Sequence, residues 1–354
     1  MMARARLVLF SLLSLWAPPA FGQANYESAL IGGRSSLMGG TGVAAGTDSA
    51  APLQNPATIV GIEGTSFVFS TFFLQLTNRR VTPDQNLLAE VDRGGAALDQ
   101  MQFRVLPNST CLFFDLYKPK GGRSEGLHKG SICLAEPETQ TFELLTTVVG
   151  EGLSGRSGFQ QRFISQTYSK KVYSIGWATS LSERVSIGAN TMLEEVGFRD
   201  MEGISSVLTD EASLDEAIGA TAQANTSVIT RRASSFALSA LVGARWRFSD
   251  AFSVGASLHS PSLHVTGSYS GTRSSEATSS ADEQYSQEKG SARFTYPMRL
   301  ALGIAGRLGA VRFEANGYYH EGRGDFAEVQ ATRSAVYLDD GVISEAGSEQ
   351  VTYR

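Results

Sequence analysis

The chain has 354 residues, of which 42% are hydrophobic and 18% are charged, and its formal net charge is −5. This weakly acidic balance provides no basic surface for nucleic acid, so we expect no nucleic-acid partner. The length alone would allow two soluble domains. However, no Pro-rich or Ser-rich linker divides the sequence, and the composition does not change after Gly64.

The first 24 residues have the parts of a secretory signal peptide. Arg4 and Arg6 precede an apolar run over residues 7–16, and small residues follow Pro19. This run is too short to cross a bilayer as a helix, and its flanks are those of a signal peptide. We therefore expect residues 1–24 to be removed and the mature chain to be exported.

Residues 25–63 are rich in glycine and small polar residues and lack the periodicity of a helix or strand. Glycine allows a non-helical backbone to pack tightly. Near the end of this segment Pro56 stiffens the chain, and the amide of Asn55 can satisfy backbone polar groups. A surface turn that merely precedes the first strand is the simpler alternative.

The rest of the chain alternates between apolar and polar residues. Over residues 236–248 an apolar face opposes a face that carries Ser239, Gly243, Arg245 and Arg247. Such alternation predicts β-strands with two different faces. The expected strands are 64–78, 99–106, 109–118, 130–135, 140–149, 159–181, 184–199, 228–248, 251–270, 289–307 and 310–322, with a bulge near Pro261.

The connections between these strands are of two kinds. Those near residues 183, 250 and 309 are tight, whereas those over 200–227, 271–288 and 322–345 are long and polar. Long two-faced strands joined alternately by short turns and long loops are typical of an outer-membrane barrel. A large soluble sandwich needs neither feature. We therefore expect an all-β fold, a transmembrane antiparallel β-barrel over residues 64–354.

The two cysteines, Cys111 and Cys133, lie on either side of Gly122 in a glycine-rich stretch. A hairpin that turns at Gly122 would bring the two cysteines into register. In an exported chain such a pair predicts a disulfide, with two free thiols as the alternative.

The stretch from Gly32 to Ser70, GGRSSLMGGTGVAAGTDSAAPLQNPATIVGIEGTSFVFS, resembles the amino-terminal hatch and first strand of the OmpP1/FadL/TodX family of outer-membrane proteins. The hairpins between residues 167 and 320 also look like the middle of this family. The matching features of the hatch are Gly39, Gly40, Gly42, the acidic segment Asp48-Ser49-Ala50, and the motif residues Asn55, Pro56 and Ala57.

The resemblance implies a barrel of about 14 strands whose lumen is plugged by residues 25–63. It implies gated uptake of long-chain fatty acids or aromatic hydrocarbons, with no cofactor, metal ion or catalytic residue. The expected partners are the hydrophobic ligand, outer-membrane lipid and the outer-membrane assembly machinery. The alternative is a non-transport barrel that acts as a scaffold or shuttle for other envelope proteins.

Two departures from the family pattern concern the end of the chain. The expected strands are odd in number, and the last residue is Arg354 where family members usually have an aromatic residue. From these features we expect the closing strands of the barrel to be missing.

The segment 200–227 is the most informative of the long connections. Ser213 and Glu216 open a short stretch that favours a helix. The resemblance implies that outward loops of this kind form a hydrophobic groove that captures ligand, whereas a loop helix packed on the rim is the alternative. The candidate groove residues are Ile204, Val207, Leu208, Leu214 and Ile218.

No other motif predicts chemistry. The stretch Gly40-Thr41-Gly42 has no strand before it and no periodic helix after it, so it does not predict a phosphate loop. None of the four histidines lies at metal-ligand spacing from cysteines or carboxylates. These are His128, His259, His264 and His320.

Overall fold

The computed structural model describes residues 31–37, 40–81, 98–119, 125–151, 156–210, 223–277, 283–309, 311–322, 327–339 and 342–353. Several sequence predictions fall outside these ranges: the signal peptide at 1–24, the hairpin turn at Gly122, the helix opened by Ser213 and Glu216, and the roles of Gly39, Leu214 and Ile218. Within the described ranges no helix is long and apolar enough to cross a membrane.

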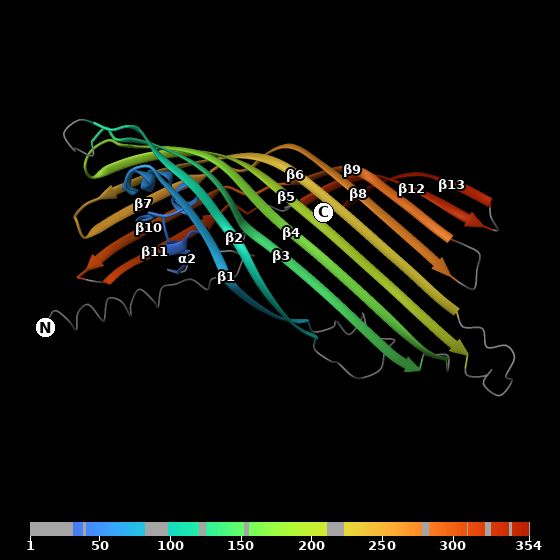
Figure 1. The fold of residues 1–354 in the computed structure, drawn as a ribbon. Helices are drawn as coiled ribbons and strands as arrows, with labels where there is room; N and C mark the ends of the chain where they lie inside the picture. The colour runs from blue at the N-terminus through green and yellow to red at the C-terminus, as the bar shows by residue number, and fades with distance from the viewer. Residues whose placement is uncertain are drawn as a thin grey trace.

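The described strands form a single 13-stranded antiparallel sheet (Figure 1). Six long strands lie side by side in chain order from β1 to β6. The bounds are β1 (Ser66–Val81), β2 (Leu98–Tyr117), β3 (His128–Glu151), β4 (Arg156–Ser180), β5 (Val185–Asp210), β6 (Gln223–Arg247), β7 (Phe252–His259), β8 (Leu263–Ala277), β9 (Glu283–Phe294), β10 (Arg299–Leu308), β11 (Val311–His320), β12 (Ala327–Asp339) and β13 (Val342–Tyr353).

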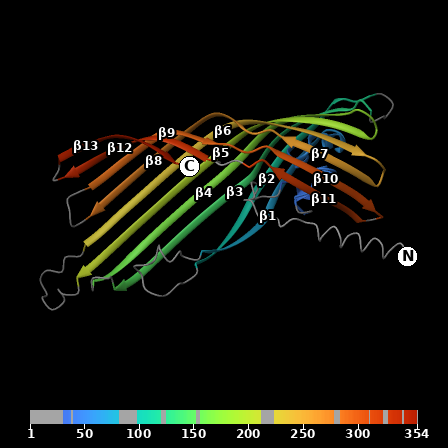
Figure 2. The same ribbon diagram turned by 180° about the vertical axis from the view of Figure 1, so that it is seen from behind.

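Prolines divide two of the expected strands. The expected strand 251–270 is broken into β7 and β8 around Pro261, where the sequence predicted only a bulge, and 289–307 is broken into β9 and β10 around Pro297. Proline lacks the N–H that a central strand needs. Beyond β6 the sheet therefore continues as two branches, β7-β10-β11 at one end and β8-β9-β12-β13 at the other (Figures 1 and 2).

The prediction of long loops is wrong over most of their length. β5 continues to Asp210 and β6 begins at Gln223, while β8, β9, β12 and β13 occupy much of 271–288 and 322–345. Polar residues there continue the ladders, because pairing with neighbouring strands satisfies their backbone groups. Likewise, β2 and β3 each join two expected short strands into one.

The two faces of the sheet have opposite chemistry. On the outer face large apolar side chains are exposed, with Phe67 at 68%, Ile175 at 69% and Trp246 at 53% of their full surface. On the inner face charged and polar side chains such as Lys129 and Glu194 are buried. Monomeric soluble proteins rarely expose such an apolar face. The sheet is therefore apolar on the outside and polar on the inside.

β2 and β3 pair along only part of their length. Their described pairs end at Ser109 and Ala135. Just beyond, β3 has a bulge relative to β4 at Glu136 and Pro137, after which Glu138 pairs with Lys170. The extra residue of a bulge shifts the alternation by one position. Ala135 and Glu138 are therefore both buried, although they are three residues apart.

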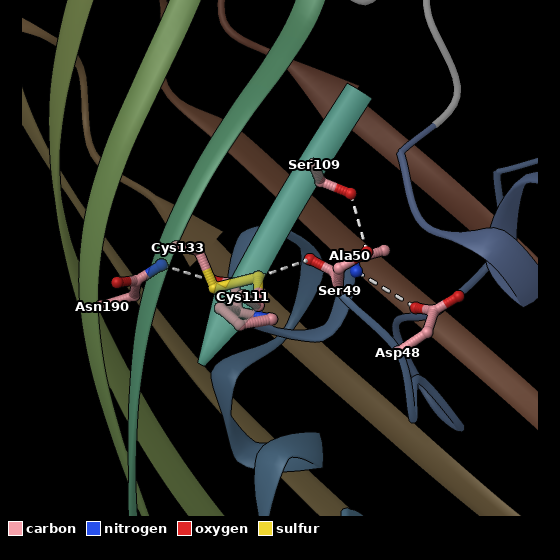
Figure 3. The surroundings of a disulfide bond; sticks show 8 residues. Asp48, Ser49, Ala50, Ser109, Cys111, Cys133 and Asn190 are labelled. Atoms are coloured by element: carbon pink, nitrogen blue, oxygen red, sulfur yellow. Dashed lines mark hydrogen bonds between the residues drawn. A yellow bond between two sulfur atoms is a disulfide. The ribbon is translucent and has the colours of Figure 1, made fainter. Parts of the chain in front are cut away.

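A disulfide joins Cys111 of β2 to Cys133 of β3, which face each other in the register of the two strands (Figure 3). Their Cα atoms are 4.2 Å apart. The bond lies two residue pairs from the point where β2 and β3 part. It therefore holds the two strands together next to that point.

The sheet is not closed in the part of the chain that the structure describes. β1, β11 and β13 each pair with a single neighbour there. The inner and outer faces are nevertheless defined, because the amino-terminal segment lies within the curve of the sheet (Figures 1 and 2).

Replacing both Cys111 and Cys133 by serine should lower the free energy of unfolding by roughly 3 kcal/mol, because the covalent loop no longer restricts the unfolded chain. Urea unfolding of the detergent-solubilised protein would measure this loss. Wild-type protein under reducing conditions should match the double variant. An unfolding midpoint that neither reduction nor substitution changes would contradict the prediction.

Candidate functional site

The amino-terminal segment, residues 31–64, folds as three short helical turns on the inner face of the sheet. These are α2 (Gly33–Leu37), α3 (Ala51–Gln54) and the 3-10 helix η1 (Pro56–Gly61). The carboxylate of Asp48 accepts hydrogen bonds from Ser35 N at 2.7 Å, Ser35 Oγ at 2.9 Å and Ala50 N at 3.1 Å. Asp48 thus ties α2 to α3, although each is too short to be stable by itself.

Asn55 is the central residue of this segment and is fully buried. Its Oδ1 accepts from Ala57 N at 3.1 Å and so caps η1. Its Nδ2 donates to the carbonyl oxygen of Val43 at 2.6 Å and to that of Ala244 in β6 at 3.0 Å. One amide therefore joins two parts of the segment to each other and to the sheet.

Polar side chains of the strands supply further partners for the backbone of the segment. From β5, Ser186 Oγ donates to the carbonyl of Ala57 at 2.9 Å, and Asn190 Nδ2 donates to that of Pro52 at 2.6 Å. From β7, Ser253 Oγ donates to the carbonyl of Ala44 at 3.1 Å. Lys129 in β3 and Arg299 in β10 also donate to carbonyl oxygens of the segment, and Glu314 in β11 accepts from Ala44 N. Ser109 in β2 forms a hydrogen bond with the side chain of Ser49.

Four strand glycines let the segment lie directly on the sheet. A Cβ added to Gly188 would lie 2.6 Å from the backbone of Pro56, and one on Gly243 would lie 2.0 Å from Asn55 Oδ1. Added Cβ atoms on Gly255 and Gly303 would likewise meet Val43. Gly188 of β5 pairs with Gly243 of β6, and Gly255 of β7 pairs with Gly303 of β10, so the four glycines form two cross-strand pairs.

Apolar contacts complete the interface between the segment and the strands. Leu53 belongs to a buried cluster with Met192 and Leu241 on the inner face. Ile59 belongs to a second cluster that contains the disulfide cysteines. Beside it, Cys111 Sγ lies 3.5 Å from the carbonyl oxygen of Ser49 (Figure 3). The disulfide therefore supports the surface on which the segment packs.

The predicted motif residues Asn55, Pro56 and Ala57 are all buried at this interface. Gly40 has a φ of 83° and Gly42 a φ of 158°, and an added Cβ on Gly42 would lie 2.4 Å from Gln54 Oε1. The four strand glycines were not predicted as part of the site. A recurrent Gly-Ala pair in strands β5, β6 and β7 was the available signal.

A buried polar cluster lies farther along the inner face. Lys170 Nζ is 2.9 Å from Glu194 Oε2, and His259 Nε2 is 3.6 Å from Glu194 Oε1. Ser239 donates to Glu194 and lies 3.1 Å from His259. Lys170 Nζ also lies 3.4 Å from the centroid of the Tyr296 ring, in the break between β9 and β10. This inner polar cluster joins four separate strands and one connecting segment.

An aromatic and aliphatic cluster lies next to the inner polar cluster and shares Tyr296 with it. Its inward-facing members come from β4, β5, β6, β8, β9, β12 and β13. Tyr168 forms a hydrogen bond with Tyr296 and an edge-on ring contact with Phe294. The inner aromatic cluster comprises Val196, Ala233, Tyr269, Ala292, Phe294, Tyr296 and Ala331, with Tyr168, Phe198, Ala327, Val329 and Tyr353 packed against it.

The expected loop groove is not formed by the three candidate residues that the structure describes. Ile204, Val207 and Leu208 lie within β5, which pairs with β4 and β6 along this stretch. Alternation along a strand places positions 204 and 207 on opposite faces. These residues therefore form no loop surface.

The described residues contain no group of three or more histidine, cysteine or carboxylate side chains that could hold a metal ion. His259 instead belongs to the inner polar cluster, and His264 Nδ1 lies 3.2 Å from Ser235 Oγ.

No protein-family model matches the sequence, and no curated protein matches it. Among solved structures, the chain is similar to the P. putida toluene transporter TodX, with a TM-score of 0.47 and 14% identity over 90% of this chain and 82% of that chain. It is similar to the Ralstonia pickettii toluene transporter TbuX, with a TM-score of 0.41 and 12% identity over 91% and 86%. It is also similar to a Pseudomonas aeruginosa FadL homologue, with a TM-score of 0.33 and 11% identity over 82% of each chain.

The variant Gly243→Ala should loosen the amino-terminal segment, because its new methyl group would overlap Asn55 Oδ1. Limited proteolysis followed by mass spectrometry would measure faster cleavage within residues 31–64. Gly317→Ala in β11 is the matched control, since an added Cβ there meets nothing within 4 Å. Equal cleavage rates in the two variants would contradict this packing.

The variant Lys170→Met should cost roughly 3–5 kcal/mol of unfolding free energy, because it leaves the buried Glu194 carboxylate without its main partner. The double variant Lys170→Met, Glu194→Met should recover much of that loss. Urea unfolding of the three proteins would give both values, with Lys171→Met as the control for removal of a neighbouring lysine. A double variant no more stable than the single one would contradict the pairing.

Proposed function

We propose that this chain is an outer-membrane protein that takes up hydrophobic small molecules by gated diffusion through a plugged β-barrel. Long-chain fatty acids and aromatic hydrocarbons are the substrate classes that the sequence resemblance implies. In this proposal the amino-terminal segment is the plug, and no covalent chemistry takes place.

The observation that carries the proposal is the reversed chemistry of the sheet. Its outer face exposes apolar side chains, while its inner face buries lysine, glutamate, asparagine and serine. In a bilayer this arrangement is favourable, because lipid covers the apolar face and strand pairing satisfies the backbone. In water the same outer face would favour aggregation. The outer membrane is therefore the proposed location.

The amino-terminal segment is suited to act as a plug. Its backbone is hydrogen-bonded to side chains of strands in both halves of the sheet, from β3 to β11. A barrel wide enough to hold such a segment would conduct water and ions without it. We propose that uptake requires a local rearrangement of this segment and not its complete release.

Two further features indicate a route for the ligand. The inner aromatic cluster offers an apolar surface on the far side of the inner polar cluster from the segment. The parting of β2 and β3 beyond Ser109 and Ala135 lies at the level where Glu138 pairs with Lys170. We propose that ligand binds at the inner aromatic cluster and leaves sideways between β2 and β3.

The alternative function, a scaffold or shuttle for other envelope proteins, predicts no bound small molecule. Mass spectrometry of protein purified in detergent would distinguish the two functions. We expect a co-purified hydrophobic compound, and uptake of labelled oleate or toluene into cells that depends on the protein. Absence of any bound compound, together with uptake equal to that of cells lacking the protein, would exclude the transport proposal.

The variant Asn55→Ala should weaken the plug without unfolding the sheet. It removes bonds to Val43, Ala57 and Ala244, and an unsatisfied buried group typically costs about 1–3 kcal/mol. Conductance of single proteins in planar bilayers should rise, while heat-modifiable gel mobility stays unchanged. Asn225→Ala, which truncates an exposed asparagine near the start of β6, is a matched control. Unchanged conductance in Asn55→Ala would contradict the gating role.

A further inference from the structure

An arginine-lined pocket lies at the end of the sheet that carries the tight turns. It has a volume of about 220 Å³ and lies between the amino-terminal segment and strands β6, β7, β10 and β11. Five arginines line it: Arg34, Arg245, Arg247, Arg307 and Arg312. A water molecule occupies about 30 Å³ in the liquid, so the pocket has room for a small anion.

The positive charge of the arginine-lined pocket is not balanced by the protein. Five arginines and two carboxylates, Asp250 and Glu314, leave an excess of three formal positive charges. One of these carboxylates already has a hydrogen-bond partner in the amino-terminal segment, because Glu314 Oε1 accepts a hydrogen bond from Ala44 N at 2.8 Å. Arg307 and Arg312 are directly opposite each other in the β10–β11 ladder, and like charges so placed repel.

The hydrogen bonds of these arginines go to neutral oxygens. Arg34 donates to Thr47 Oγ1, Arg247 to the carbonyl of Glu183 and Arg307 to that of Gly309. Arg245 Nε is buried and has no hydrogen-bond partner among the described residues. Among the residues that the structure describes, none of the five pocket arginines forms an ion pair with a carboxylate.

We propose that this pocket binds a small oxyanion, a phosphate or carboxylate group, which joins Arg34 of the amino-terminal segment to the arginines of the strands. Guanidinium groups bind both kinds of group through paired hydrogen bonds. The anion relieves the repulsion between Arg307 and Arg312 and fixes the segment to the wall beneath it. The site does not depend on the proposed transport, since its binding can be measured without any transported ligand.

Three kinds of molecule could supply the bound oxyanion, and a binding experiment can distinguish them. Free inorganic phosphate, octanoate and dioctanoyl phosphatidic acid present the group as an ion, as a fatty carboxylate and as a lipid headgroup, respectively. Isothermal titration of the full chain in a neutral detergent would compare the three at constant ionic strength, because salt screens exposed charges. The probe with the highest affinity identifies the source.

The variants remove arginines from the two sides of the pocket, the strands and the amino-terminal segment. We expect Arg307→Gln with Arg312→Gln, and separately Arg34→Gln, to weaken binding of the best probe at least tenfold. Arg184→Gln is the matched control, because Arg184 lies in a turn at the same end of the sheet but does not line the pocket. Heat-modifiable gel mobility would verify that each variant is folded.

The outcomes are decisive in both directions. A tenfold loss in the pocket variants with no change in Arg184→Gln supports the site. Wild-type protein that binds none of the three probes would overturn it, and so would pocket variants that bind as well as wild type. If Arg34→Gln alone keeps full affinity, the anion does not join the segment to the strands, and the proposed link is wrong.

Discussion

The need to satisfy a buried, non-helical backbone is the constraint on which the rest of the inner face depends. Residues 41–50 are not helical, and α3 and η1 after them are too short to pair all of their own polar groups. A buried unpaired group is costly. Asn55, Ser186 and Asn190 supply the missing partners from the segment and from β5. The polar inner face of the strands is thus explained by the segment that lies on it, while the apolar outer face is explained by lipid under the proposed function.

The strand pattern was largely predictable, because alternation is local. A period of two identifies which face of β5 or β6 is apolar wherever the two faces differ in polarity. It fails where both faces are polar, so the strand ends near Asp210 and Gln223 were taken for a loop. It also cannot distinguish a bulge from a break at Pro261, because that outcome depends on how the neighbouring β9 and β10 pair.

The site was predictable only where a single short stretch carries it. Asn55, with Pro56 after it, is noticeable in sequence because both residue types favour special backbone conformations. Lys170, Glu194 and His259 are distant in sequence, and each by itself looks like an ordinary residue of a solvated face. Their proximity follows from the register of β4 to β7, which no local pattern encodes. The same is true of the strand glycines, because the need for glycine at position 243 follows only from the contact with Asn55 in the folded chain.

The bulge and the inner polar cluster lie at one level of the sheet, and the disulfide lies a few residues closer to the amino-terminal segment. Together they favour a sideways path under the proposed function. A neutral hydrophobic ligand that moved from the inner aromatic cluster toward the amino-terminal segment would have to pass the buried pair of Lys170 and Glu194. Separating or desolvating such a pair is costly. The pairing between β2 and β3 ends at the same level, so a ligand there meets a parting in the wall. The bond between Cys111 and Cys133 then limits how far this parting extends toward the plug, which allows the wall to open while the surface under the plug stays intact.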